Sequence, residues 1–159
     1  MTVKLIGNDD LSLTNGTIGE SVKYMRFAAE KSGSLSDIQI GVGTGNSGNA
    51  KVAILSDNSS NPGTVLGSSG STAFIAGMNL IPLSAPADIV AGTYYWLAFI
   101  TSASGVSYIS TGYANKYKSA TYSSFSFSND PTGLSDGAST YQIAGFGTTG
   151  GRLFQVIVC

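Results

Sequence analysis

The chain has 159 residues, a formal net charge of −1 and only eight Lys and Arg residues, so it lacks the basic surface that binds nucleic acids or anionic membranes. Charged residues make up 11% of the chain and histidine is absent, which removes the commonest general base and metal ligand. A chain of this length buries roughly two thirds of its unfolded surface, so one domain over residues 1–159 needs neither a metal nor a disulfide to fold.

The first predicted elements are two strands. Residues 21–31 fit both helical and strand periodicity, but a Gly/Ser turn follows, and residues 37–42 then alternate apolar and polar side chains. We therefore interpret these segments as two strands joined by a turn. The tract GTGNSGN at 43–49 predicts a hairpin loop, because each glycine costs backbone entropy in a regular element.

The next strand covers residues 51–55 and leads into SDNSSNPG at 56–63. In this turn Pro62 presets φ, and we expect Gly63 to supply a left-handed conformation. Residues 73–83 are apolar but contain Pro82, which donates no ladder hydrogen bond. Pro82 therefore predicts an edge strand or a strand end.

The strongest predicted strand is residues 93–101, TYYWLAFIT, which is apolar on both faces and is typical of a central, doubly covered strand. We expect residues 106–110 to pair back with it across the TSASG turn. The Tyr- and Ser-rich stretch 112–136 predicts a long excursion rather than a buried strand pair. Residues 141–146 and 153–158 are expected to close the sheet.

Strands spaced roughly 10 to 15 residues apart, with Gly, Pro and Asn between them and no intervening helix, predict an all-β fold. The expected architecture is an antiparallel β-sandwich, jelly-roll-like, with about eight to ten strands.

Four segments carry a resemblance to known proteins: KVAILSDNSSNPGTVL, APADIVAGTYYWLAF, FSNDPTGLSDG and YQIAGFGT. Together they resemble jelly-roll modules of phage tail-fibre and virion proteins and of prokaryotic surface proteins, over most of residues 21–148. The resemblance implies a surface-displayed, non-catalytic role and offers no catalytic residue. The matched positions are architectural: Asp57, Pro62, Gly63, Gly92, Tyr94, Tyr95 and Trp96.

The low share of charge, beside 21 Gly, indicates a surface of hydroxyls, amides and glycine, as on secreted and virion proteins. We expect a virion or an extracellular, cell-surface location. No stretch approaches the roughly 18 to 20 apolar residues that span a bilayer, so we expect no membrane insertion. The start lacks the apolar core of a secretory signal, which fits a virion protein or a leader already removed. Cys159, the single cysteine, is expected to end a strand or to be a terminal handle rather than a reactive thiol.

Enzyme chemistry is hard to assemble from these residues, and we expect no enzyme. Asp9 and Asp10 are the only adjacent carboxylates and are typical of a solvated turn, while nothing in the sequence brings Asp57 to Asp130. No cofactor is expected. Calcium is the one metal whose ligand chemistry is present, but turn formation explains those oxygens better: Asp57, Asn58, Asn61, Asn129 and Asp130.

A glycan site is the remaining binding hypothesis, because sugars stack on exposed aromatic rings beside polar side chains. We expect core packing for Trp96. The candidates lie in the excursion: Tyr113, Asn115, Lys116, Tyr117 and Tyr122. Two alternatives stay open for these tyrosines, a plain loop cover and a contact with a second copy in a homo-oligomer.

The sequence thus favours a non-catalytic structural or attachment module on a virion or cell surface, with a glycan or a host surface receptor as partner and no nucleic acid. The alternatives are a carbohydrate-binding module of a larger secreted glycan-active enzyme and a glycan-cleaving enzyme that uses carboxylates.

Overall fold

The structure, a computed structural model, describes residues 1–9, 14–15, 21–43, 47–102, 107–109, 115–137 and 140–150. These residues form strands and one short 3₁₀ helix, η1 (Tyr122–Ser124). The strands are β1 (Val3–Asn8), β2 (Thr14–Asn15), β3 (Ser21–Ala28), β4 (Gly33–Val42), β5 (Gly48–Asn58), β6 (Asn61–Ser68), β7 (Thr72–Phe74), β8 (Gly77–Ile89), β9 (Tyr94–Thr101), β10 (Ser107–Ile109), β11 (Asn115–Ser119), β12 (Ser135–Asp136), β13 (Thr140–Tyr141) and β14 (Ile143–Thr149).

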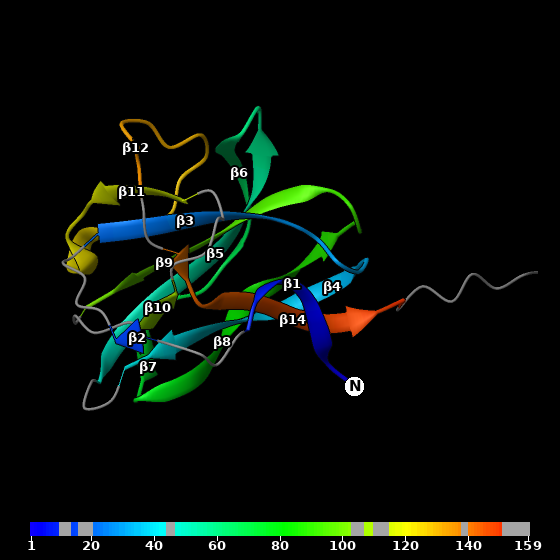
Figure 1. Ribbon diagram of the computed structural model, residues 1–159, viewed down its shortest axis with the longest axis horizontal. Coiled ribbons are helices and arrows are strands. Elements are labelled where there is room, and N and C mark those ends of the chain that lie inside the picture. Colours follow the sequence, from blue (N-terminus) through cyan, green and yellow to red (C-terminus); the bar gives the residue numbers. More distant parts are fainter. Residues whose placement is uncertain are drawn as a thin grey trace, which may run out of the picture.

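Two antiparallel sheets form the body of the molecule (Figure 1). One has the order β1-β14-β4-β8, and the other has the order β12-β11-β3-β9-β5-β6 with β7 also paired to β5. If the eight long strands are numbered along the chain, the sheets have the orders 1-8-3-6 and 2-7-4-5. This is the strand order of a jelly roll, so the all-β, jelly-roll-like sandwich expected from the sequence is confirmed. The two sheets together contain eleven strands, slightly more than the expected eight to ten.

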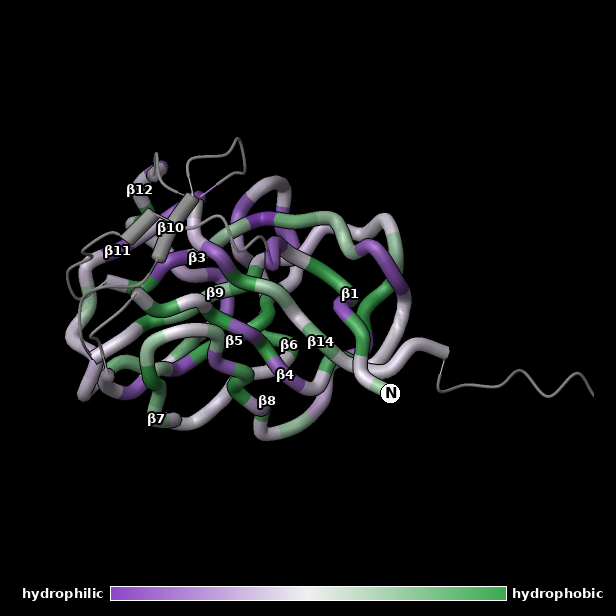
Figure 2. The backbone as a smooth tube through the Cα atoms, turned by 60° about the horizontal axis from the view of Figure 1, so that its bottom comes forward, coloured by the Kyte–Doolittle hydropathy of each residue, from purple (hydrophilic) through white to green (hydrophobic). Residues whose placement is uncertain are grey.

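The central strands β3, β9 and β5 are apolar on both faces, because one face packs against the other sheet and the opposite face is covered by a connecting segment. Toward the other sheet, side chains such as Met25, Leu97 and Ile54 form the inner core with Ile38 and Ile143. Figure 2 shows the strongly apolar stretches gathered within the layers and the turns paler or hydrophilic. The expected role of residues 93–101 as a central strand is confirmed: in β9 only Tyr94 is exposed.

A second apolar cluster, the outer core, lies on the opposite face of the larger sheet. Its strand residues include Val22, Tyr24, Leu55, Trp96 and Ile100. The chain that covers them is the stretch from 120 to 134, which contributes Ala120, Tyr122, Phe125, Phe127 and Leu134. We call residues 120–134 the cover segment. The molecule therefore has three layers where this segment lies.

The β5–β6 hairpin turns within the expected segment 56–63, but three residues before Pro62 and Gly63. Asn58 pairs with Asn61, so Ser59 and Ser60 are the turn residues, with φ of 50° and 65°. A two-residue hairpin turn of type I′ needs positive φ at both central positions. Gly63 does not have the expected positive φ; a Cβ there would lie 2.7 Å from the Ser56 Oγ, so close packing requires the glycine.

Three other expectations have definite outcomes. Pro82 lies in β8, the edge strand of its sheet, as expected. Strand β10 pairs with β2 and β13 rather than with β9, so the pairing expected across the TSASG turn is wrong. The excursion is not free of paired strands, since β11 adds to the sheet beside β3. The expected strand at 153–158, together with Cys159 and Asp10, lies outside the described residues.

Candidate functional site

The cover segment is fixed to the outer face of the sheet mainly at Tyr122. Its ring is 8% exposed, and its hydroxyl lies 2.6 Å from the Ser71 Oγ. The Lys51 ammonium lies 4.5 Å from the ring centroid and donates to the backbone carbonyls of Tyr122 and Phe125 at 2.9 and 2.8 Å. Because these contacts use both ends of the side chain, Tyr122 acts as an anchor for the segment.

The far end of the cover segment is tied to the edge strand β6. The Val65 N–H donates to the Asn129 Oδ1 at 2.9 Å, and the Asp130 N–H donates to the Gly63 carbonyl at 2.8 Å. On the other side, the Lys118 ammonium donates to the Thr132 carbonyl at 3.0 Å. Residues 125–132 therefore cross the outer face of the sheet and are hydrogen-bonded to β6 on one side and to β11 on the other.

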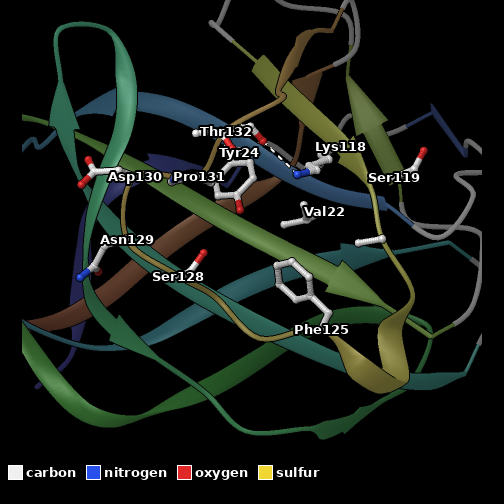
Figure 3. Close-up of a pocket in the computed structure, with 11 residues that line it drawn as sticks. Val22, Tyr24, Lys118, Ser119, Phe125, Ser128, Asn129, Asp130, Pro131 and Thr132 are labelled. Carbon is white, nitrogen blue, oxygen red and sulfur yellow. Dashed lines mark hydrogen bonds between the residues drawn. The ribbon is translucent and has the colours of Figure 1, made fainter.

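A pocket of about 400 Å³ lies under this stretch (Figure 3). Val22 and Tyr24 of β3 form its floor, and Phe125 and Pro131 supply apolar walls. The remaining lining residues are Lys118, Ser119, Ala120, Ser128, Asn129, Asp130 and Thr132. Its volume lies in the range of about 300 to 1,000 Å³ that small-molecule sites occupy, and its lining combines four apolar residues with seven that carry polar side chains.

Tyr24 is the buried polar group of the pocket. The residue is only 2% exposed, and within the described residues its hydroxyl has no hydrogen-bond partner. Figure 3 shows this hydroxyl directed toward the space between Ser128 and Val22. Burial raises the pKa of Tyr24 to about 12, so at neutral pH the hydroxyl keeps its proton and remains a donor. Because the hydroxyl opens onto the pocket, an acceptor on a bound ligand can take its hydrogen bond in place of solvent.

The two charged residues of the lining lie at opposite sides of the pocket (Figure 3). The Asp130 carboxylate accepts a 3.4 Å hydrogen bond from the Asn58 Nδ2, on the side of the β5–β6 hairpin. Lys118 is exposed, and in the described part of the chain it forms no ion pair. The Lys118 side of the pocket therefore offers a positive charge that no carboxylate of the described residues neutralises.

The sequence-predicted glycan residues do not form one surface in the described structure. Tyr113 lies outside the described residues. Asn115 is 6% exposed, Lys116 pairs with Asp136 at 2.8 Å, and Tyr122 is the buried anchor. Tyr117 is 37% exposed, but it lies opposite Lys23, whose ammonium is 4.9 Å from the ring centroid.

Tyr117 thus belongs to the face of the sheet turned away from the cover segment. Side chains alternate along β3, so Lys23 and Tyr117 point to the opposite side from the pocket residues Val22 and Tyr24. Tyr117 and Tyr122 are therefore separated by the sheet. A glycan site that uses Tyr113 and Tyr117 stays a prediction.

The carboxylates considered for catalysis or calcium have other partners. Asp57 accepts hydrogen bonds from the Arg26 Nε and Nη2 at 3.0 and 2.8 Å and from the Trp96 Nε1 at 2.8 Å. These donors, the Arg26 guanidinium first, hold the pKa of Asp57 below its usual value. The fold does bring the neighbouring Asn58 to Asp130, which the sequence did not indicate. Asp9 pairs with Lys4 at 3.2 Å. Among the residues described, no three acidic, Cys or His side chains gather to hold a metal.

Sequence reasoning missed Tyr24 and Val22 as pocket residues. The signal was present in SVKYMRF, where both alternating faces carry large apolar side chains. A strand that is apolar on its second face requires a second cover, and the excursion at 112–136 was the longest stretch left without a predicted strand.

No protein-family model matches the chain, and no curated protein matches its sequence. In the described part of the molecule, no helix has the length and apolar character needed to cross a bilayer.

Proposed function

We propose that this chain is a non-catalytic attachment module displayed on a virion or cell surface, and that it binds a glycan in the pocket beneath residues 125–132. The observation that carries the proposal is the pocket, because its volume suits a sugar and its lining places hydrogen-bond donors beside apolar surface. The Phe125 ring offers a stacking surface, and Tyr24, Lys118 and Ser128 supply groups that hydrogen-bond hydroxyls.

Surface display is supported by composition and resemblance. With 11% charged residues and 21 Gly, the chain presents hydroxyl and amide groups to solvent in the manner of virion and secreted proteins. The jelly-roll strand order fits the modules that the sequence resembles. Binding groups on a connecting segment held by a rigid sandwich are the usual arrangement for recognition.

A glycan array tests the proposal directly. Because one monosaccharide site makes few contacts, the purified chain should bind with a Kd of about 0.1 to 1 mM, and multivalent display on beads should make the signal measurable. Ser128→Trp places a large ring at the exposed rim of the pocket and should abolish binding.

Ser123→Trp is the matched control, because Ser123 is exposed on the same cover segment and does not line the pocket. Both variants should show wild-type circular dichroism. A multivalent array without any glycan signal, or equal binding by wild type and Ser128→Trp, would overturn the proposal.

A further inference from the structure

The lining of the pocket narrows the class of glycan. Two of its groups donate hydrogen bonds and one of them is cationic: the Tyr24 hydroxyl, which comes from the floor, and the Lys118 ammonium, which comes from the side opposite Asp130. The lining carboxylate, Asp130, lies on the other side and already accepts from Asn58. A ligand that fits must therefore bring an acceptor, preferably an anionic one, to the Lys118 side.

Both donors have free capacity. An ammonium has three N–H groups, and within the described residues Lys118 uses one, on the Thr132 carbonyl. The Tyr24 hydroxyl uses none there, although the side chain is 98% buried. The Tyr24 hydroxyl is the independent sign of a ligand, because a core tyrosine whose hydroxyl faces an open pocket without a partner is uncommon.

The pocket also has an apolar part that a bare anion would leave unused. Val22, Phe125 and Pro131 supply apolar surface on the floor and walls, and an ion without apolar surface would leave these side chains in contact with water. A sugar ring has an apolar face of C–H groups that packs against such walls, while its substituents reach the polar rim.

We propose that the pocket binds a sugar that carries a carboxylate, with the carboxylate on Lys118 and Tyr24 and the ring against Phe125. The inference rests on the proposed function and specifies its ligand. A free sugar acid and an acidic residue at the end of a glycan present the same chemistry. Phosphorylated sugars are less suited, because a phosphate monoester carries a charge of about −1.5 to −2 at pH 7, and among the lining residues only Lys118 is cationic.

The test uses two probes that differ only at the group in question. Methyl glucuronide carries a carboxylate where methyl glucoside carries a hydroxymethyl group. Titrations followed by NMR chemical shifts should show that the glucuronide binds about tenfold more tightly at low ionic strength, and that added salt weakens this preference.

Three variants assign the preference to residues. Lys118→Gln should remove the preference for the glucuronide, whereas Lys118→Arg should retain most of it. Tyr24→Phe should weaken glucuronide binding about three- to tenfold without lowering Tm, because the hydroxyl has no partner to lose in the free protein.

Two control variants separate local effects from general ones. Lys116→Gln removes a charge two positions away that pairs with Asp136 and does not line the pocket, so it should leave binding unchanged. Tyr122→Phe removes a hydroxyl that does have a partner, and it should lower Tm without changing the preference.

The outcomes distinguish the inference from the proposed function. Equal binding of the two probes, or a preference that survives Lys118→Gln, overturns the inference and leaves glycan binding intact. Binding of acetate as tightly as of the glucuronide overturns the role of the sugar ring. Absence of binding by every sugar on a multivalent array removes the proposed function itself.

Discussion

Trp96 should be among the most costly side chains to truncate in the outer core. It is 0% exposed, it lies in the middle of β9, and its Nε1 donates to Asp57 at 2.8 Å. Truncation of a buried Trp to Ala costs about 3–5 kcal/mol through lost burial and the cavity that remains. Trp96→Ala should therefore lower the free energy of unfolding by that amount, measured by urea denaturation followed by circular dichroism.

Trp96→Phe separates the hydrogen bond from the ring. It keeps much of the buried aromatic surface but leaves the Asp57 carboxylate without one donor, and a hydrogen bond to a charged group contributes about 1.5–3 kcal/mol. The wild-type chain should also show blue-shifted, quencher-resistant emission from this single tryptophan.

Tyr94→Ala is the control on the same strand, because Tyr94 is 46% exposed and packs on the Arg26 guanidinium at 3.8 Å. An exposed cation–π contact contributes only about 0.5–1 kcal/mol. If Trp96→Ala lost less than about 0.5 kcal/mol, the range of ordinary surface positions, the outer core would not be a packed core.

Further predictions concern pH, packing and the untested tyrosines. The folded-state pKa of Asp57 is below its usual 3.8, so the stability it contributes is present above that pH and is lost as the pH falls through the lower folded value. The difference in unfolding free energy between wild type and Asp57→Asn should therefore shrink as urea titrations are moved below pH 3.8. Gly147→Ala should lower the free energy of unfolding by more than about 3 kcal/mol or prevent folding, because the added Cβ would overlap a backbone carbonyl of β4 that has no room to move. Gly70→Ala is the control: Gly70 has open space around it, so the variant should melt within a degree or two of wild type. The Tyr113→Ala, Tyr117→Ala double variant should keep its glycan-array signal if the pocket is the binding site. A lost signal would favour the two tyrosines as the binding site. A lower molecular mass by light scattering would show that the tyrosines hold copies of the chain together.

The sandwich could be predicted because strand patterning and turn residues report directly on burial. TYYWLAFIT is apolar on both faces, and β9 is indeed covered on both. Pro82 cannot donate to a ladder, and it lies on an edge strand. In both cases the local side-chain pattern is sufficient to predict where the strand lies in its sheet.

Long-range pairing and the candidate site were harder, because they depend on which distant segments meet. The partners of β10 come from residues 14–15 and 140–141, more than 30 positions away, and no local pattern identifies them. Tyr122 was interpreted as a sugar platform since it lies in a polar excursion, but its ring and hydroxyl are both satisfied by Lys51 and Ser71. Whether an aromatic ring in a loop faces solvent or the sheet depends on contacts that are distant in sequence.

The two apolar cores share little beyond the strands β3, β9 and β5, so the molecule has two units that can open separately. Loss of the contacts at Tyr122, together with the hydrogen bonds of Asn129 and Asp130 to β6, would release residues 120–134 and leave the packing between the sheets intact. In native-state hydrogen exchange, amides of the cover segment should exchange through a low-energy local opening, and those of β9 only through global unfolding.

The same separation makes the walls of the pocket tolerant of change. Neither Ser128 nor Pro131 belongs to the inner core, so substitutions there can alter the shape of the pocket while the packing between the sheets stays unchanged. The scaffold and the shape of the pocket can therefore be changed independently of each other.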